Sequence, residues 1–182
     1  STHMNLGTTT VQPRAPLAPR HRRAPALALL LGLACAAGGA VAGTVEVNFQ
    51  SADTYTDAGR HTLDREQTLK TLQTHFGDLG ARLPAQQHLT ITVTDVDLAG
   101  EMDWTRGGQD IRVLRGRADW PRMRLSYVLR EGERELTRGE ARLSDPSYLQ
   151  FGAGLQRHVP LPYEKRMIER WFHDTLSPTA AP

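Results

Sequence analysis

Cysteine is almost absent from this sequence: Cys35 is its single cysteine, and it lies in an apolar stretch near the N-terminus. One cysteine forms neither an internal disulfide nor a zinc site built from several thiolates. Folding must therefore depend on an apolar core. The chain has 182 residues, which is enough for one domain of ordinary size, about 100–150 residues.

Several patterns of well-known enzymes are also missing. The sequence contains no G-x-S-x-G nucleophile elbow and no glycine loop of the kind that binds phosphate. The five histidines after residue 42 are scattered, and no two have the H-x-x-x-H spacing of a zinc site on a helix. We therefore expect a binding domain rather than an enzyme.

Acidic residues are absent from residues 1–42, which carry four arginines and then an apolar run over 24–42. The run ends on Ala40-Val41-Ala42, so this segment has the charged start, apolar core and small-residue end of a cleavable signal peptide. We predict cleavage before Gly43. An uncleaved membrane anchor is the alternative, because the run is close to the shortest that spans a bilayer.

The leader predicts that the protein is periplasmic or secreted. After cleavage we expect one domain over residues 43–176 and a flexible tail over 177–182. We expect no membrane span in that product. The formal charge of +2 becomes −2 without the four leader arginines. A mature domain with a net negative charge does not have the basic surface of a nucleic-acid-binding protein, so we expect no nucleic-acid partner.

The apolar periodicity predicts an α+β fold. Alternation indicates strands at 44–49, 110–114, 122–130 and 133–143, and helical spacing indicates one helix between Asp64 and Pro84 and another from Pro162. With the strand that begins at Leu89, the order is β-α-β-β-β-β-α. We expect a single, mostly antiparallel sheet of four to five strands with two helices on one face.

The stretch Leu89–Glu101 (LTITVTDVDLAGE) is the most informative of the chain. It alternates apolar and threonine residues up to Thr94, and continuing that period would bury Asp95 and Asp97. Burial of an unpaired carboxylate is costly. We therefore predict a β-bulge near Thr94–Asp95 that returns the next apolar residues to the core and leaves the acids at the end of the strand.

The strands at 122–130 and 133–143 are predicted to form a hairpin. Glu131-Gly132 is the expected tight turn, which pairs Tyr127 with Leu136. The alternation of the second strand slips at Gly139, where we predict another bulge. The charged outward residues of this hairpin suit a solvent-facing or edge position.

Carboxylates gather around the end of the central strand. Asp95, Asp97 and Glu101, together with Asp119, could bind a divalent cation, the only cofactor the sequence indicates, or act as the acid and base of a hydrolase. Many arginines stand nearby in sequence, among them Arg122. Structural ion pairs between these arginines and the acids are the interpretation that we favour.

Two segments carry aromatic residues of interest. Trp120 lies in an arginine-rich run and is interpreted either as a ligand-stacking residue or as a buried anchor. The long connection over 144–161 contains further apolar residues, and such long loops are often functional. The candidate ligand surface comprises Tyr55, Asp57, Trp120, Tyr148 and Phe151.

A set of motifs along the chain resembles the bacterial family called domain of unknown function 3016. The motifs are Tyr55-Thr56-Asp57, Asp95–Glu101, Asp119-Trp120-Pro121-Arg122, Tyr163-Glu164-Lys165-Arg166 and Trp171-Phe172. The resemblance covers essentially the whole domain after the leader. It implies a small exported bacterial domain and transfers no catalytic residue.

Three functions remain open at this point. The first is an exported binding domain for an envelope protein, another envelope component or a small ligand. The second is a carboxylate- or metal-dependent hydrolase centred on Asp95, Asp97 and Glu101. The third is a structural module that assembles through an exposed edge strand; the sequence does not fix the oligomeric state.

Overall fold

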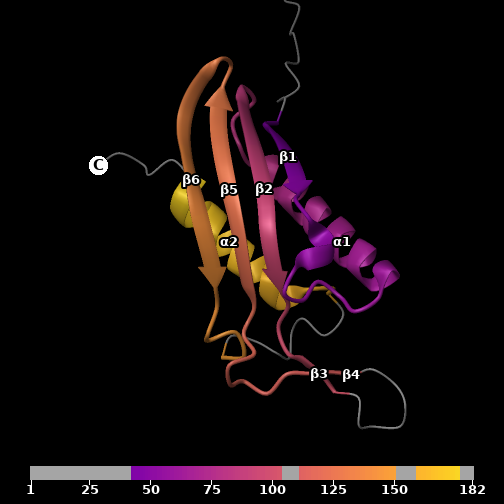
Figure 1. Cartoon of the computed structure of the whole chain (residues 1–182). Coiled ribbons are helices and arrows are strands. Elements are labelled where there is room, and N and C mark those ends of the chain that lie inside the picture. The colour runs from indigo at the N-terminus through magenta and orange to yellow at the C-terminus, as the bar shows by residue number, and fades with distance from the viewer. Residues whose placement is uncertain (1–41, 104–110, 151–158, 177–182) are drawn as a thin grey trace, which may run out of the picture. The chain divides into compact units, whose positions relative to one another are not determined.

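The computed structural model describes residues 42–103, 111–150 and 159–176. A four-stranded sheet and two helices make up most of it (Figure 1). The elements in chain order are β1 (Thr44–Phe49), a short 3-10 helix (Ala52–Thr54), α1 (Thr62–Gly80), β2 (Gln87–Asp97), β3 (Glu101–Asp103), β4 (Ile111–Val113), β5 (Arg122–Glu131), β6 (Arg134–Ser144) and α2 (Pro162–Leu176).

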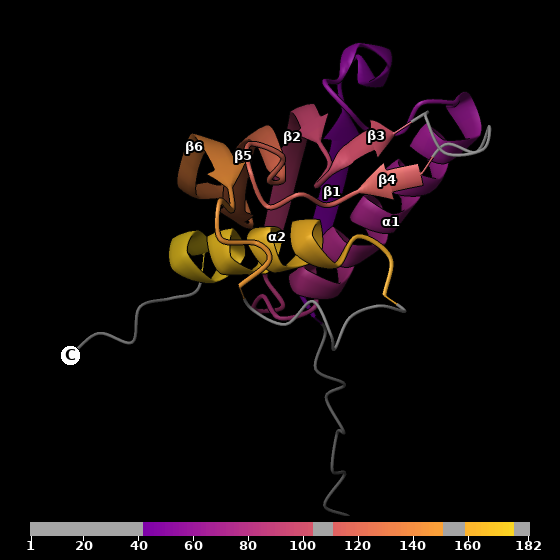
Figure 2. The same cartoon turned by 90° about the horizontal axis from the view of Figure 1, so that it is seen from below.

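The strand order in the main sheet is β1-β2-β5-β6, and β3 and β4 form a separate two-stranded ribbon. The α+β class is confirmed, and Figure 2 shows both helices on the same face of the sheet. The main sheet is mixed, because β1 and β2 are parallel while the other neighbours are antiparallel. Helix α1 connects β1 to β2 as a crossover, and such a connection returns the chain in the same direction.

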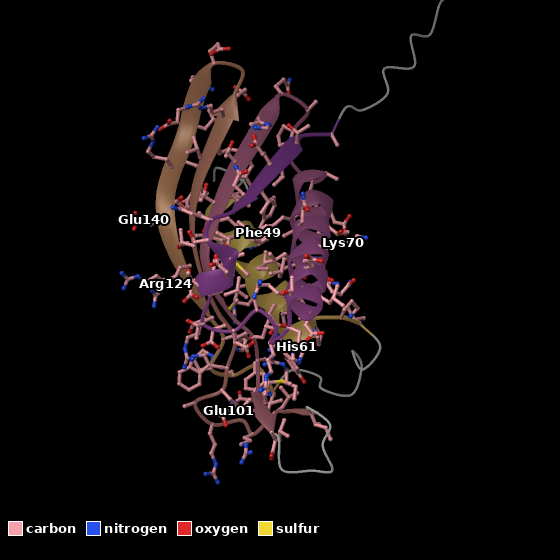
Figure 3. All side chains as sticks on the ribbon, turned by 45° about the vertical axis from the view of Figure 1, so that its right-hand side comes forward. Phe49, His61, Lys70, Glu101, Arg124 and Glu140 are labelled. Carbon is pink, nitrogen blue, oxygen red and sulfur yellow. The ribbon has the colours of Figure 1, made fainter. Side chains whose placement is uncertain are left out.

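The core lies between the sheet and the helices. Fully buried apolar side chains come from α1, β2, β5 and α2, and Phe49 of β1 points toward α1 (Figure 3). The opposite face of the sheet carries polar residues such as Thr90 and Thr92 on β2. The most deeply buried apolar residues of the helices and of β2 are Leu72, Phe76, Leu79, Leu89, Ile91, Val93, Val96 and Ile168.

The predicted β-bulge in β2 is confirmed. The pairing of β2 with β5 shifts between Val93 and Asp95. After the shift Val96 is fully buried and Leu98 is 6% exposed, so the apolar side of the chain returns to the core. Asp95 and Asp97 instead lie on the polar side, opposite Arg124 and Arg122 of β5.

The predicted details of the β5–β6 hairpin were wrong by a few residues. The turn is Gly132-Glu133, with φ +57° at Gly132, and the closing pair is Glu131–Arg134. The register shift lies at Leu129/Arg130 on β5, so Tyr127 pairs with Gly139 rather than with Leu136. Gly139 is not a bulge. A Cβ there would lie 2.9 Å from the Tyr127 hydroxyl, so the absence of a side chain at Gly139 leaves room for the Tyr127 ring.

Candidate functional site

The chain segments that follow the parallel strands meet at one end of the sheet, the lower end in Figure 1. The loop after β1, the residues after β2 and the β3–β4 ribbon all lie there. Open α/β sheets often bind ligands beyond the carboxyl ends of their parallel strands. This end also holds most of the acidic residues singled out by the sequence.

Two of the predicted acids are held by neighbouring groups. The Asp95 carboxylate accepts hydrogen bonds from the backbone N–H of Thr56 (2.8 Å) and from its hydroxyl (3.0 Å), with Arg124 at 4.0 Å. The Asp97 carboxylate lies 2.8 Å from a guanidinium nitrogen of Arg122. Asp95 therefore ties the loop after β1 to the end of β2, and Asp97 ties strand β5 to it.

Arg122 has further contacts of its own. Its guanidinium lies 4.5 Å from the centre of the Trp120 ring and donates to the carbonyl of Ala118 at 3.0 Å. Trp120 is half-buried, and one face of its ring is covered by this arginine. The cation–π contact that the sequence offered for a ligand is thus made within the chain.

Asp57 and Arg112 form the central ion pair of this end. Their nearest atoms are 2.8 Å apart, and each side chain is 26% exposed. Arg112 also donates to the carbonyls of Ala99 (3.3 Å) and Gly100 (3.0 Å), so one side chain joins β4 to two other segments. The sequence singled out Asp57, whereas Arg112 was one of several nearby arginines that were equally good partners for the acids.

Glu164 is a second residue whose role the sequence did not reveal. It is 2% exposed and accepts a 2.7 Å hydrogen bond from the backbone N–H of Ala99. Burial raises the pKa of this carboxyl above its usual value, while the hydrogen bond from Ala99 works in the opposite direction. The first turn of α2 is thereby attached to the segment that leaves β2.

Asp119 and Tyr148 belong to the interior. Asp119 is 6% exposed, and burial alone would raise its pKa. Hydrogen bonds from the N–H of Arg115 (2.6 Å), the Tyr148 hydroxyl and the N–H of Arg117 (2.8 Å) outweigh this and lower the pKa. Tyr148 is fully buried, so this predicted ligand-surface residue anchors the loop between β4 and β5.

Two hollows adjoin the Asp57–Arg112 ion pair, and each partner of the pair lines one of them. We call the first the apolar pocket; its volume is about 490 Å³, and Arg112 forms part of its wall. It is lined by Leu98, Ala99, Arg112, Leu114, Leu149, Val159, Leu161, Pro162, Tyr163 and Glu164. These residues come from the end of β2, the β4 region and both sides of the start of α2.

We call the second hollow the polar cleft; its volume is about 520 Å³, and Asp57 forms part of its wall. It brings together four predicted residues, Tyr55, Asp57, Asp97 and Glu101. The Tyr55 hydroxyl donates to the carbonyl of Val93 at 2.8 Å, and burial raises the pKa of Tyr55 to about 12, with a smaller effect of Asp95. Figure 3 shows Glu101 beyond the end of the sheet.

Some of the predicted features lie in parts of the chain that the structure does not describe. Phe151, residues 1–41 and the tail over 177–182 lie outside the described residues. Within the described ranges, no three histidine, aspartate or glutamate side chains are grouped so that they could hold a metal ion. In that same part of the chain no helix is long and apolar enough to cross a membrane.

Comparison with known proteins agrees with the resemblance read from the motifs. The model of the family described as "Protein of unknown function (DUF3016)" matches residues 43–174. No curated protein and no solved structure matches the chain.

Proposed function

The chain belongs to the DUF3016 family, and we propose that it is an exported binding domain whose apolar pocket takes the aliphatic chain of an envelope lipid. The leader pattern of residues 1–42 supports export. The observation that carries the proposal is the composition and the bonding of the side chains that line the pocket. Its two charged side chains are already bonded within the chain, and the rest of the wall is mainly aliphatic.

The internal bonds of the two charged residues favour binding over catalysis. Arg112 is shared by Asp57 and two carbonyl groups, and Glu164 is occupied by the Ala99 amide. Neither side chain can leave these partners without leaving a buried polar group unpaired, which costs about 1–3 kcal/mol. A ligand in this pocket therefore meets apolar surface and needs no charged group of its own there.

The size and the rim of the pocket fit a lipid chain. Pockets of about 300–1,000 Å³ typically enclose small molecules, and this one has about 490 Å³. Leu114 is 39% and Val159 is 44% exposed, and both line the pocket. An aliphatic chain that enters would cover these two side chains, and each methylene that it buries contributes about 0.8 kcal/mol.

A chain-length series tests the proposal. Hexyl, octyl, decyl and dodecyl phosphocholine are titrated below their micelle concentrations, and binding is followed by calorimetry. We expect Kd to fall about fourfold for each added methylene until the pocket is filled, and then to level off. A Kd that does not depend on chain length would contradict the proposal, as would binding of a short apolar peptide but of no alkyl probe.

Hydrolysis remains the second candidate, because the polar cleft places Asp57, Asp97 and Glu101 in one wall. Two of these carboxylates are paired with arginines, and the third is an exposed residue 3.7 Å from Arg115. The test is turnover of ester and glycoside substrates by the wild type and by Glu101→Gln, with and without Mg²⁺. Turnover that Glu101→Gln abolishes would replace the binding account.

A further inference from the structure

Strand β6 is an edge of the main sheet, with β5 on one side and no strand of the described residues on the other. From Arg138 to Ser144 it pairs regularly with β5 and contains no proline. The register shift of this hairpin lies before that stretch. A regular edge of this length presents a row of backbone N–H and C=O groups on which another strand can pair.

The outward side chains of this stretch include two charges that have no partner among the described residues. Glu140 and Arg142 are two residues apart and therefore point to the same face. In the part of the chain that the structure describes, neither side chain has an ion pair or a hydrogen bond, whereas Arg134 is bonded to Glu131 and Arg138 to Glu135. Figure 3 shows Glu140 pointing away from the sheet on the face opposite α1.

Arg142 also stands in an unfavourable position within its own chain. It lies directly opposite Arg124 of β5, and like charges in that position destabilise a sheet. The nearest carboxylate to Arg124 is Asp95, at 4.0 Å, and that carboxylate is bonded to Thr56. Strand β6 therefore carries a positive charge that its own sheet does not neutralise.

We propose that two copies of this chain pair antiparallel through β6, with a two-fold axis at Ala141. In that register Glu140 of each copy faces Arg142 of the other, which forms two ion pairs from the four unpartnered charges. The two Ala141 side chains meet at the axis, where their small size permits close approach of the strands. This pairing joins the two four-stranded sheets into one continuous sheet. Both copies use the same strand, as in an isologous interface.

Neighbouring registers fit the charges less well. An axis at Glu140 would place each Glu140 against its own copy and Arg138 against Arg142, so that every charged pair is repulsive. An axis at Gly139 would pair Glu140 with Arg138, which is already bonded to Glu135 within the chain. The axis at Ala141 is the register in which the two unpartnered charges meet each other.

Sedimentation velocity over a concentration series tests this interface, which does not depend on the apolar pocket. We expect a concentration-dependent dimer for the wild type. Glu140→Arg alone and Arg142→Glu alone should each raise the dimer dissociation constant on the order of tenfold or more. The double variant Glu140→Arg/Arg142→Glu restores both pairs with exchanged signs and should dimerise like the wild type.

Lys70→Glu is the matched control, because Lys70 lies on the outer side of α1, away from β6 (Figure 3). It should not change the dimer. Thermal unfolding of every variant shows whether the fold is retained, as expected for exposed side chains. A wild type that is monomeric at every concentration would overturn the proposal. Single variants that dimerise normally would also overturn it, as would a double variant that stays monomeric.

Discussion

The polar cleft and the apolar pocket are each lined by one partner of the same ion pair, yet their walls are built in opposite ways. In the polar cleft, Asp57 and Asp97 each have an arginine partner and Tyr55 donates to a backbone carbonyl. In the apolar pocket, Arg112 and Glu164 are bonded within the chain, and the aliphatic side chains line the open volume of the pocket. At this end of the sheet these charged groups of both walls are therefore bonded within the chain, and the open surface of the apolar pocket is mainly aliphatic.

Replacement of Arg112 by alanine should have the largest effect, because this side chain lines the apolar pocket and is paired with Asp57, which lines the polar cleft. It would leave Asp57 and the carbonyls of Ala99 and Gly100 without their donor. We expect a loss of about 2–3 kcal/mol in the free energy of unfolding, below the value for a fully buried pair since both side chains are 26% exposed. Urea unfolding measures this loss.

Arg115→Ala is the control for that variant. Arg115 is 48% exposed and lies 3.3 Å from Asp103 and 3.7 Å from Glu101, at the surface of the ribbon. Exposed pairs contribute little, so its removal should change the free energy of unfolding by less than about 1 kcal/mol. Equal losses in the two arginine variants would contradict the central place given to Arg112.

Tyr148→Phe separates a buried tyrosine from a pocket-lining one. Its hydroxyl accepts from the N–H of Gly116 and donates to Asp119, so its loss removes a donor from the buried Asp119 carboxylate and an acceptor from the Gly116 N–H. We expect a destabilisation of about 1–2 kcal/mol in urea unfolding. Tyr163→Phe is the matched control: the two rings pack edge to face at 5.0 Å, and this variant should retain nearly full stability.

Glu164→Gln tests the buried carboxyl of the apolar pocket by its pH dependence. Burial raises the pKa of Glu164, so the folded protein binds this proton more tightly than the unfolded chain does. Its contribution to stability is therefore present at low pH and is lost as pH rises through the raised pKa. The glutamine variant has no such loss and can still accept from the Ala99 amide.

Urea unfolding from pH 4 to pH 8 measures the difference. Relative to the wild type, Glu164→Gln should gain stability as pH rises through the raised pKa of Glu164. A wild type and variant that change in parallel over this range would show that the buried carboxyl is not perturbed.

Asp97→Asn, a variant of the polar cleft, should have the smallest effect on the free energy of unfolding. The Asp97–Arg122 pair is partly exposed, so we expect a loss of about 1 kcal/mol or less in the free energy of unfolding. Binding of decyl phosphocholine should remain unchanged, because Asp97 does not line the apolar pocket. A large loss of alkyl binding would place the site in the polar cleft instead.

Local pattern was a good guide to part of this fold. The bulge at Asp95 followed from the break in alternation, and the start of α2 at Pro162 followed from the residue's place at a helix N-terminus. Other features depend on distant packing. The absence of a side chain at Gly139 leaves room for the Tyr127 ring. The parallel direction of β1 and β2 depends on how the crossover helix packs on the sheet.

The candidate site divides in the same way. The acids at the end of β2 stand together in sequence and were predicted, whereas the partner of Glu164 lies 65 residues away at Ala99. The apolar pocket combines Leu98, Leu149 and Leu161 from three segments, and each of them reads as an ordinary core residue in sequence. Such a hollow is visible only after the chain has folded.

The apolar pocket is tested most directly by a pair of leucine variants in a titration with decyl phosphocholine. Leu114 lines the pocket and is 39% exposed, while Leu136 lies on β6 and is 37% exposed, so Leu114→Glu and Leu136→Glu place the same charge at equally exposed leucines. We predict at least a tenfold weaker Kd for Leu114→Glu and a wild-type Kd for Leu136→Glu. Equal binding by both variants, or equal loss in both, would contradict the account.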